Sequence, residues 1–243
     1  MEREFLTKAI VLCSNDYKEK DKQVTLFTID SGRITAVLKG CKSPKAKLKF
    51  AYNPFCFAEF QIVEKNGFYT IINASLIDSF FDLSANYNKY ILANIALDIC
   101  NHIVRQDEPN VPMFLALVST LKTLCYEQKN EKMLLIKFLL SSLENLGYKL
   151  SFKTCQRCEM PFSFEKYLDL SCGELVCQNC KTFSSIKLSN IAFNSLKIIN
   201  ETEIERFETL KLNEQALKEI IDVLLENVEA RIERKLLSKK MLA

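Results

Sequence analysis

Four cysteines in two pairs have the clearest chemistry in this sequence. Cys155 and Cys158 are separated by two residues, Cys177 and Cys180 likewise, and eighteen residues lie between the pairs. Two residues between cysteines let both thiolates reach one ion, and four thiolates complete a tetrahedron about 2.3 Å from zinc. The spacing therefore predicts one structural Zn²⁺ ion held by Cys155, Cys158, Cys177 and Cys180.

The segment around these cysteines is too short to fold without help. A module of 26 residues buries little apolar surface, so a metal would supply the folding energy. Its small core is predicted to contain Phe162, Phe164, Tyr167 and Leu175. Two cysteine pairs packed in an apolar core are the alternative. Cys172 lies between the pairs without a partner at this spacing. We interpret it as a neighbour of the site, although it could substitute for a ligand.

Catalysis at this site is not expected. Four thiolates leave zinc no open position for water. Zinc deaminases need an H-x-E motif and a P-C-x-x-C motif, whereas here Val104 takes the place of the glutamate after His102 and Val176 precedes Cys177. His102 is the single histidine, which excludes any mechanism that needs a histidine pair within this chain. The sequence therefore predicts a protein that is not an enzyme.

A second candidate site is the lysine-rich segment of residues 39–49. It contains no acidic residue and five lysines: Lys39, Lys42, Lys45, Lys47 and Lys49. Gly40 and Pro44 prevent a continuous helix, which predicts a long exposed loop. Each lysine that neutralises a phosphate releases a counterion, so such a loop binds nucleic acid without reading its sequence. Arg33 would extend this surface. A solvated loop without a ligand is the alternative.

Five predicted strands must position the lysine segment. They are rich in β-branched and aromatic residues and cover residues 7–13, 23–30, 34–39, 55–63 and 68–76. Turn residues separate them, and Asn66-Gly67 is the strongest two-residue hairpin signal because both positions need a positive φ. Five short strands within 80 residues predict a small closed barrel. An SH3-like barrel and a generic antiparallel sheet are the alternatives.

Helical periodicity begins after these strands. Apolar residues recur at every fourth position from Tyr87 to Ile103, which predicts a helix with Ser84 as its N-cap. Gly147 is expected just after the end of another helix, and Asn213 at the start of a long one. The further predicted helical segments are residues 113–127, 131–146, 188–210 (two short helices) and 212–237.

The amino-acid composition excludes several classes of protein. Apolar residues make up 48% of the 243 residues and charged residues 26%, which excludes a disordered chain. No apolar run approaches the roughly 20 residues of a membrane helix, and the first residues lack a signal-peptide core. We therefore expect a cytoplasmic protein with reduced cysteines. The net charge of +3 is too small to indicate a partner by itself.

Four stretches of the sequence resemble the RecO family of recombination mediators. The first is the opening AIVLCSNDYKEKDKQVTLFTIDSGRITAVLKG with the basic CKSPKAKLK after it, and the second is FYTIINASLIDSF. The third is the cysteine insert with LSCGELVCQNC, and the fourth is the ending ENVEARIERKLLSKKML. The resemblance covers nearly the whole chain in the right order. The N-terminal block and the ending are specific, whereas the cysteine pairs alone are not.

The resemblance implies a fold and a set of site residues. The fold class is α+β, with a five-stranded OB-fold barrel at residues 1–80 that binds DNA. An all-helical domain follows at 81–243, with a zinc-ribbon-like module inserted at 151–183. The DNA-binding residues implied are Arg33, Lys39, Lys42, Lys45, Lys47 and Lys49. The four paired cysteines are implied as ligands of a structural zinc. The family usually has a Gly-Gly pair where this chain has Cys172-Gly173, so Cys172 could compete as a ligand.

The resemblance also implies a function and partners. Such proteins take part in DNA repair and homologous recombination in the RecF pathway, without catalysis and in association with the nucleoid. They bind single- and double-stranded DNA without sequence preference and anneal complementary strands. With RecR they help to load RecA onto strands coated by single-stranded DNA-binding protein, whose C-terminal tail they also bind. Arg231, Arg234 and Lys235 are candidates for a groove that takes this tail. A zinc-ribbon scaffold that docks proteins and binds DNA only incidentally is the alternative.

Overall fold

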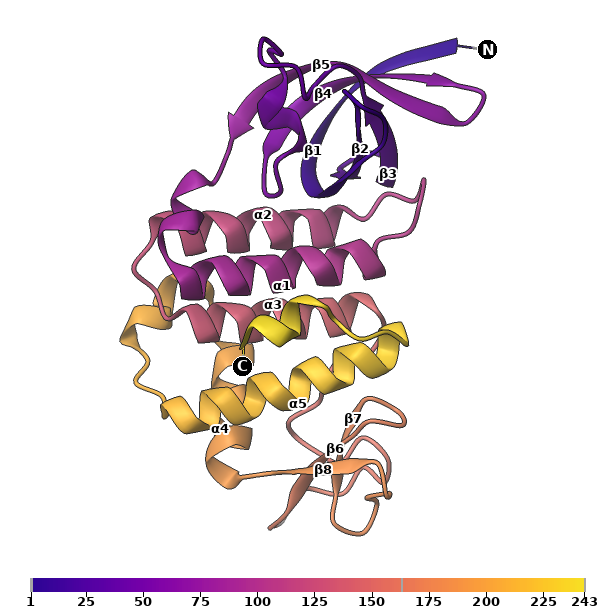
Figure 1. Cartoon of the computed structure of the whole chain (residues 1–243). Helices are drawn as coiled ribbons and strands as arrows, with labels where there is room; N and C mark the ends of the chain where they lie inside the picture. Colours follow the sequence, from indigo (N-terminus) through magenta and orange to yellow (C-terminus); the bar gives the residue numbers. More distant parts are fainter. Residues whose placement is uncertain (1, 163, 243) are drawn as a thin grey trace. The chain divides into compact units, whose positions relative to one another are not determined.

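The chain folds into two compact units in the computed structural model, which describes residues 2–162 and 164–242 (Figure 1). The first unit runs up to Tyr126 and contains a barrel and two α-helices. The second unit runs from Glu127 onwards and contains further helices and a small sheet. The lysine segment therefore belongs to the first unit and the paired cysteines to the second.

Five strands of the first unit close a barrel in the order β1-β2-β3-β5-β4, and β4 pairs back with β1. β3 runs parallel to β5, and the other neighbouring strands are antiparallel. This arrangement is that of an OB-fold, so the predicted fold class is confirmed. The strands are β1 (Glu2–Asp16), β2 (Lys22–Thr28), β3 (Gly32–Leu38), β4 (Phe57–Lys65) and β5 (Phe68–Asp78).

The first strand is longer than predicted because it pairs on both sides. Residues from Glu2 to Ile10 pair with β4, and residues from Ala9 to Asp16 pair with β2. The added residues are mostly exposed and polar, so they carry no apolar signal in the sequence. Their hydrogen bonds to β4 are what make them a strand.

Alternating side chains fill the barrel. In β3, Ile34 and Ala36 are fully buried, whereas Thr35 between them is exposed. Side chains in a strand alternate between its two faces, so one face supplies the core and the other meets solvent. Full burial of a Leu- or Ile-sized side chain contributes about 1.5–3 kcal/mol. The largest fully buried side chains of the barrel core are Leu26, Ile34, Leu38, Phe60 and Ile62.

Positive φ angles occur at the predicted hairpin. Asn66 and Gly67 join β4 to β5 with φ angles of 52° and 79°, which confirms the Asn-Gly prediction. Gly32 follows β2 with a φ of 62°. The turn at Gly32 packs closely on the chain after the first helix, where the amide of Arg33 donates to the carbonyl of Arg105 at 3.0 Å.

Two α-helices complete the first unit: α1 (Tyr87–Ile103) and α2 (Val111–Tyr126). The N-cap of α1 is Asn86, whose side chain accepts from the amide of Lys89, so the prediction of Ser84 is wrong. Ser84 instead belongs to a 3₁₀ turn, η2 (Phe81–Ala85), and its hydroxyl donates to the carbonyl of Phe81. Because this turn includes residues 81–85, the helix begins only at Tyr87.

Three α-helices of the second unit pack together: α3 (Glu131–Asn145), α4 (Asn190–Glu201) and α5 (Glu214–Ile232). Asn213 caps α5 as predicted, with its side chain accepting from the amide of Ala216. Gly147 follows α3 with a φ of 90°, also as predicted. α5 ends before residue 237 because Glu233 adopts a left-handed φ of 54°.

A three-stranded sheet follows α3 and precedes α4 in the chain, with the strand order β7-β6-β8. Its antiparallel strands are β6 (Lys166–Asp169), β7 (Glu174–Cys177) and β8 (Ser185–Leu188). Tyr167 and Leu175 are buried as predicted, but Phe164 is 84% exposed, so its assignment to the core is wrong. Phe164 precedes β6, and the alternation of the strand does not fix its direction.

The domain limits at residues 80, 151 and 183 stay predictions. Compactness groups α1 and α2 with the barrel, so the two compact units divide at residue 126. Within the described residues, no helix combines the length and the apolar character that spanning a bilayer requires.

Replacing Gly32 with alanine should destabilise the fold far more than replacing Gly67. A Cβ at Gly32 would lie 2.0 Å from the carbonyl oxygen of Glu108, whereas a Cβ at Gly67 meets no atom within 4 Å. Both positions have a left-handed φ. We expect Gly67→Ala to cost about 1–2 kcal/mol and Gly32→Ala at least about 2 kcal/mol more, because the backbone must shift. Denaturant unfolding measures both. Equal losses would contradict the close packing of this turn.

Candidate metal centre and nucleic-acid interface

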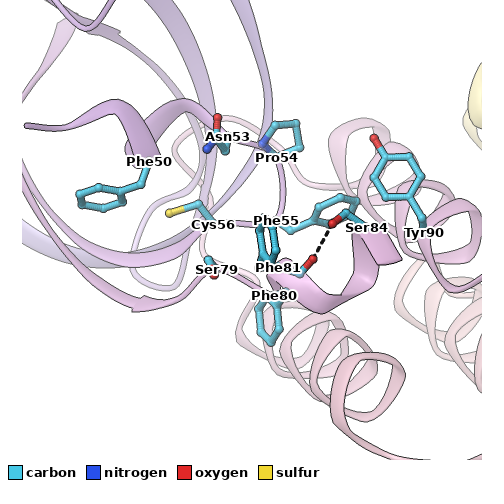
Figure 2. Close-up of a pocket in the computed structure, with 10 residues that line it drawn as sticks. All are labelled: Phe50, Asn53, Pro54, Phe55, Cys56, Ser79, Phe80, Phe81, Ser84 and Tyr90. Atoms are coloured by element: carbon cyan, nitrogen blue, oxygen red, sulfur yellow. Dashed lines mark hydrogen bonds between the residues drawn. The ribbon is translucent and has the colours of Figure 1, made fainter. Parts of the chain in front are cut away.

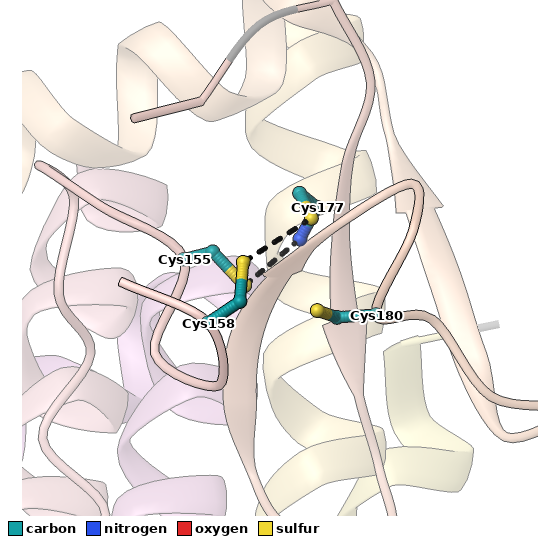
Figure 3. A group of neighbouring side chains, drawn as sticks. All are labelled: Cys155, Cys158, Cys177 and Cys180. Atoms are coloured by element: carbon teal, nitrogen blue, oxygen red, sulfur yellow. Dashed lines mark hydrogen bonds between the residues drawn. The ribbon is translucent and has the colours of Figure 1, made fainter. Parts of the chain in front are cut away.

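The four predicted cysteines come together in the second unit (Figure 3). Cys155 and Cys158 lie on one turn, whereas Cys177 ends β7 and Cys180 lies on the turn after it. Each turn is closed by a main-chain hydrogen bond. The amide of Glu159 donates to the carbonyl of Cys155 at 2.9 Å, and the amide of Cys180 donates to the carbonyl of Cys177 at 3.1 Å.

The distances between the sulfur atoms suit a tetrahedral ion. The four Sγ atoms lie within 4.8 Å of one another. Those of Cys158 and Cys177 are 3.8 Å apart, and a tetrahedron with metal–sulfur bonds of about 2.3 Å has edges of about 3.8 Å. The cluster is therefore compatible with a zinc ion.

Main-chain hydrogen bonds also stabilise the thiolate form of one of these cysteines, Cys155. Burial raises the pKa of the Cys155 thiol, but main-chain N–H groups of Cys158, Cys177 and Arg157 lower this pKa to about 6. The amide of Cys177 donates to this sulfur at 3.4 Å. The neighbouring Cys158 thiol, in contrast, raises the pKa of Cys180 to about 12. Four thiolates repel one another, so only a cation among them would let all four lose their protons.

Cys172 has a different partner. Its Sγ accepts from the guanidinium of Arg157 at 3.3 Å, and it is not one of the four clustered sulfurs. The same guanidinium reaches the carboxylate of Asp169 at 3.2 Å. Asp169 is fully buried, and burial raises its pKa, but hydrogen bonds from Ser171 and the charge of Arg157 leave the pKa below its ordinary value. Arg157 thus links the first cysteine turn to the end of β6, and it also hydrogen-bonds to the sulfur of Cys172.

The lysine segment of the first unit is a series of turns anchored to the barrel. The side chain of Cys41 is buried in the barrel core. The amide of Ser43 donates to the carbonyl of Gly40 and that of Ala46 to Ser43, at 3.2 and 3.0 Å. The segment then enters a 3₁₀ turn, η1 (Lys49–Tyr52). Cys41 thus anchors the segment to the barrel, while its lysine side chains lie on the outside.

All five lysines of the segment are exposed. Lys42 forms an ion pair with Asp16 at 3.1 Å, and the ammonium of Lys49 donates to the carbonyl of Pro44 at 2.9 Å. Lys39, Lys45 and Lys47 form no ion pair with any carboxylate in the described part of the chain. Most of the positive charge therefore remains available to a polyanion.

The structure adds two lysines that sequence reasoning missed. The loop between β1 and β2 carries Lys18 and Lys20, both exposed. This loop lies against the lysine segment, because the amide of Lys42 donates to the carbonyl of Lys20 at 3.1 Å. The amide of Gly40 donates to the carboxylate of Asp21 at 2.8 Å. We call the exposed lysines of the two loops the lysine surface: Lys18, Lys20, Lys39, Lys42, Lys45, Lys47 and Lys49.

Arg33 is held by the structure rather than left free. Its guanidinium donates to the carbonyl of Asn101 at the end of α1, at 2.5 Å. Two of the three C-terminal candidates are also engaged. Arg231 donates to the carbonyl of Leu170 and lies 4.7 Å from the ring centre of Tyr148, and Lys235 pairs with the buried Glu229 at 3.0 Å. These contacts hold the side chains of Arg33, Arg231 and Lys235 against the rest of the chain, and their assignment to DNA or to a protein tail stays a prediction.

Comparisons with known proteins match both halves of the chain. The model for "Recombination protein O N terminal" matches residues 1–80, and the model for "Recombination protein O C terminal" matches residues 84–240. A DNA repair protein RecO of Clostridium novyi is 28% identical over 220 residues, which are 90% of this chain and 86% of the relative.

Two further relatives carry the same name. The protein of Clostridium perfringens strain 13 is 26% identical over 88% of this chain and 87% of its own length. That of Caldanaerobacter subterraneus is 27% identical over 96% of this chain and 95% of its own length. Since the two family models together span nearly all of the barrel, the helices and the cysteine cluster, the chain belongs to the RecO family.

Proposed function

We propose that this RecO-family chain acts in DNA repair and recombination by binding DNA on the lysine surface, without catalysis, and by annealing complementary strands. The observation that carries the proposal is the exposed set of lysines on two adjoining loops of an OB-fold barrel. Lysines contact phosphates, which every sequence shares, so binding to single or double strands would not depend on sequence.

The physical basis of annealing is the reduction of charge repulsion. Two complementary strands repel each other through their phosphates, and this repulsion slows their encounter. Ammonium groups that replace condensed counterions lower the repulsion and raise the local concentration of strands. Base pairing then supplies the selectivity, and the protein needs none. This division of labour requires no reacting group on the protein.

The proposed partners follow from the family rather than from the geometry. We propose that the chain binds RecR and the C-terminal tail of single-stranded DNA-binding protein, and that with RecR it helps to load RecA onto coated strands in the RecF pathway. Action on chromosomal DNA would place it at the nucleoid in the cytoplasm.

We also propose that the four clustered cysteines hold one structural zinc. The ion would join the turn of Cys155 and Cys158 to that of Cys177 and Cys180, and it would stabilise the small sheet between them. With four thiolate ligands the ion has no open position, so its role is to hold the module together.

A protein-docking scaffold is the second candidate, because the small module exposes apolar side chains. Met160, Phe164 and Phe183 are 64%, 84% and 102% exposed, and exposed apolar groups of this size often contact partners. A partner complex that forms on this chain without any annealing of DNA would favour the scaffold.

Neutralising the lysine segment should weaken DNA binding and its dependence on salt. The variant Lys42→Ala/Lys45→Ala/Lys47→Ala would lose three phosphate contacts. For single strands, the negative slope of log K against log salt should therefore become shallower by about 2. The annealing rate should fall with it. The matched control is Lys8→Ala/Lys65→Ala/Lys122→Ala, which changes the net charge equally outside the lysine surface. The same affinity, slope and annealing rate in both variants would refute the assignment of the lysine segment.

Removing the carboxylate of Asp16 should strengthen DNA binding. Hydrogen bonds and charge from Lys22 and Lys42 hold the pKa of Asp16 below its ordinary value, so this carboxylate is charged at neutral pH and competes with phosphate. Exposed ion pairs are weak, so we expect Asp16→Asn to raise affinity by no more than about fivefold. Glu2→Gln is the control, because Glu2 pairs with Lys65 at a similar 3.2 Å. Weaker binding by Asp16→Asn alone would show that the pair with Lys42 helps to hold DNA.

Metal analysis should find about one zinc per chain. Cys155→Ser should lose this zinc and lower the unfolding temperature, because a ligand and its metal are removed together. Cys172→Ser is the matched control and should keep the zinc, since Cys172 faces Arg157. A wild-type protein that is fully folded without metal would contradict the site, and zinc loss in Cys172→Ser would contradict the ligand set.

A further inference from the structure

An aromatic pocket of about 240 Å³ lies in the first unit (Figure 2). It begins at Phe50 in η1, the residue directly after Lys49. The aromatic residues that line it are Phe50, Phe55, Phe80, Phe81 and Tyr90. Its volume is below the roughly 300–1,000 Å³ of pockets that enclose a whole drug-sized molecule. The pocket therefore suits one planar group about the size of a heterocycle.

Two of these aromatic residues are held in unusual backbone conformations. Phe55 and Phe80 have φ angles of 72° and 45°, and such left-handed conformations are strained for a bulky residue. Main-chain contacts hold both. The amide of Phe55 donates to the carbonyl of Val11 at 3.0 Å, and that of Phe80 donates to the Asp78 carboxylate at 2.9 Å. Two strained phenylalanines therefore meet in one pocket, and this clustering points to a function there.

The remaining aromatic side chains differ: Phe81 is open to a ligand, whereas Phe50 packs against the barrel core. Phe55 and Phe80 are 6% and 1% exposed and form the floor. Phe81 is 76% exposed, and Phe50 and Tyr90 are partly exposed. The ring of Tyr90 meets that of Phe55 edge to face, with centres 5.7 Å apart. Phe81 is consequently the ring with the most free area for stacking.

The polar groups of the pocket are neutral. Asn53, Ser79 and Ser84 line it, and no lysine, arginine, aspartate or glutamate of the described residues does. Asp82 follows Phe81 in the chain but is not part of the lining. A carboxylate inside this pocket would lack a cation, which makes its burial costly. A neutral ring with hydrogen-bonding edges meets no such cost.

We propose that this pocket receives one unpaired base of a DNA strand whose phosphates lie on the lysine surface. The inference rests on the proposed DNA binding and goes beyond it, because it gives the chain a means to distinguish single strands from duplex. The flanking lysines attract the phosphates, and Phe81 stacks on the base. Asn53 and Ser79 offer an amide and a hydroxyl group to its edge, and the Ser84 hydroxyl, which donates to the carbonyl of Phe81, can still accept. A base in a duplex is already stacked and paired, so it cannot enter without cost.

The charge pattern favours a base over a peptide. An acidic peptide would bring carboxylates to a lining without cations, and a purely apolar side chain would leave Asn53 and Ser79 without hydrogen-bond partners. A nucleotide separates its charge from its ring, as the lysine surface and the pocket do. Stacking on an aromatic ring tolerates any base, so the pocket would not introduce sequence preference.

Phe81→Ala tests this inference, because the side chain is largely exposed and its removal leaves the core intact. The probes are a thymidine strand of about 16 nucleotides, the upper site size of an OB-fold, an abasic strand of equal length and a duplex of equal length. We expect Phe81→Ala to weaken binding of the thymidine strand by at least about fivefold. Its binding to the abasic strand, its binding to the duplex and its salt slope should match the wild type.

Two further variants control the experiment. Phe68→Ala removes a phenylalanine of nearly equal exposure, 78%, that does not line the pocket, and it should bind like the wild type. Phe81→Trp keeps a ring that can stack, so it should retain tight binding of the thymidine strand. Thermal unfolding of each variant confirms that the fold is intact.

The outcomes are distinguishable. Wild-type affinity of Phe81→Ala for the thymidine strand overturns the pocket assignment, and so does an equal loss for the thymidine and abasic strands. Loss of binding to an acidic, aromatic-ended peptide with DNA binding unchanged would make the pocket a peptide site and also overturns it. If the lysine variant loses DNA while Phe81→Ala does not, only the pocket fails. If the wild type binds none of the three DNA probes, the proposed function fails as well.

Discussion

Closure of the barrel is the constraint on which the proposed DNA interface depends. β1 pairs with β2 and β4, and β3 pairs in parallel with β5, so the loops between strands have fixed starting points. Hydrogen bonds from Gly40 to Asp21 and from Lys42 to Lys20 then join two loops into one surface. Without these bonds, the lysines would lie on two separate loops, and the positive electrostatic potential that they produce together would be weaker.

The second unit solves a different physical problem with different chemistry. The segment of short strands around the cysteines has a small core of Cys155, Tyr167, Val176 and Cys177. Such a core stabilises little by burial alone, and the thiol cluster and the Arg157–Asp169 pair supply further links. Arg231 ties α5 to Leu170 at the end of β6. A cation among the four sulfurs would complete these links.

Features set by local sequence were the ones that could be predicted. The Asn66-Gly67 hairpin, the N-cap Asn213 and the grouping of four cysteines follow from neighbouring residues, and the structure shows all three. Features set by distant pairing were missed. Lys18 and Lys20 alternate with acidic residues in the sequence, and only barrel closure shows that they adjoin the lysine segment.

Errors had the same origin. Ser84 has a favourable N-cap side chain, but the 3₁₀ turn η2 occupies it, so Asn86 caps α1 instead. Phe164 was assigned to a core although nothing local fixes its direction. The contact of Arg33 with the carbonyl of Asn101 could not be read from the sequence either, and the assignment of Arg33 to DNA stays a prediction. The aromatic pocket is likewise invisible in the sequence, because its rings come from η1, the chain just before β4, the chain after β5, and α1.

Lysine footprinting on the intact chain tests the central claim most directly. The reactivity of each lysine toward an acylating reagent would be measured by mass spectrometry with and without a bound DNA strand. We predict protection of Lys18, Lys20, Lys39, Lys42, Lys45, Lys47 and Lys49, whereas the exposed Lys8 and Lys122 stay reactive. Protection confined to lysines of the second unit, such as Lys153 and Lys181, with the lysine surface still reactive, would contradict the proposed interface.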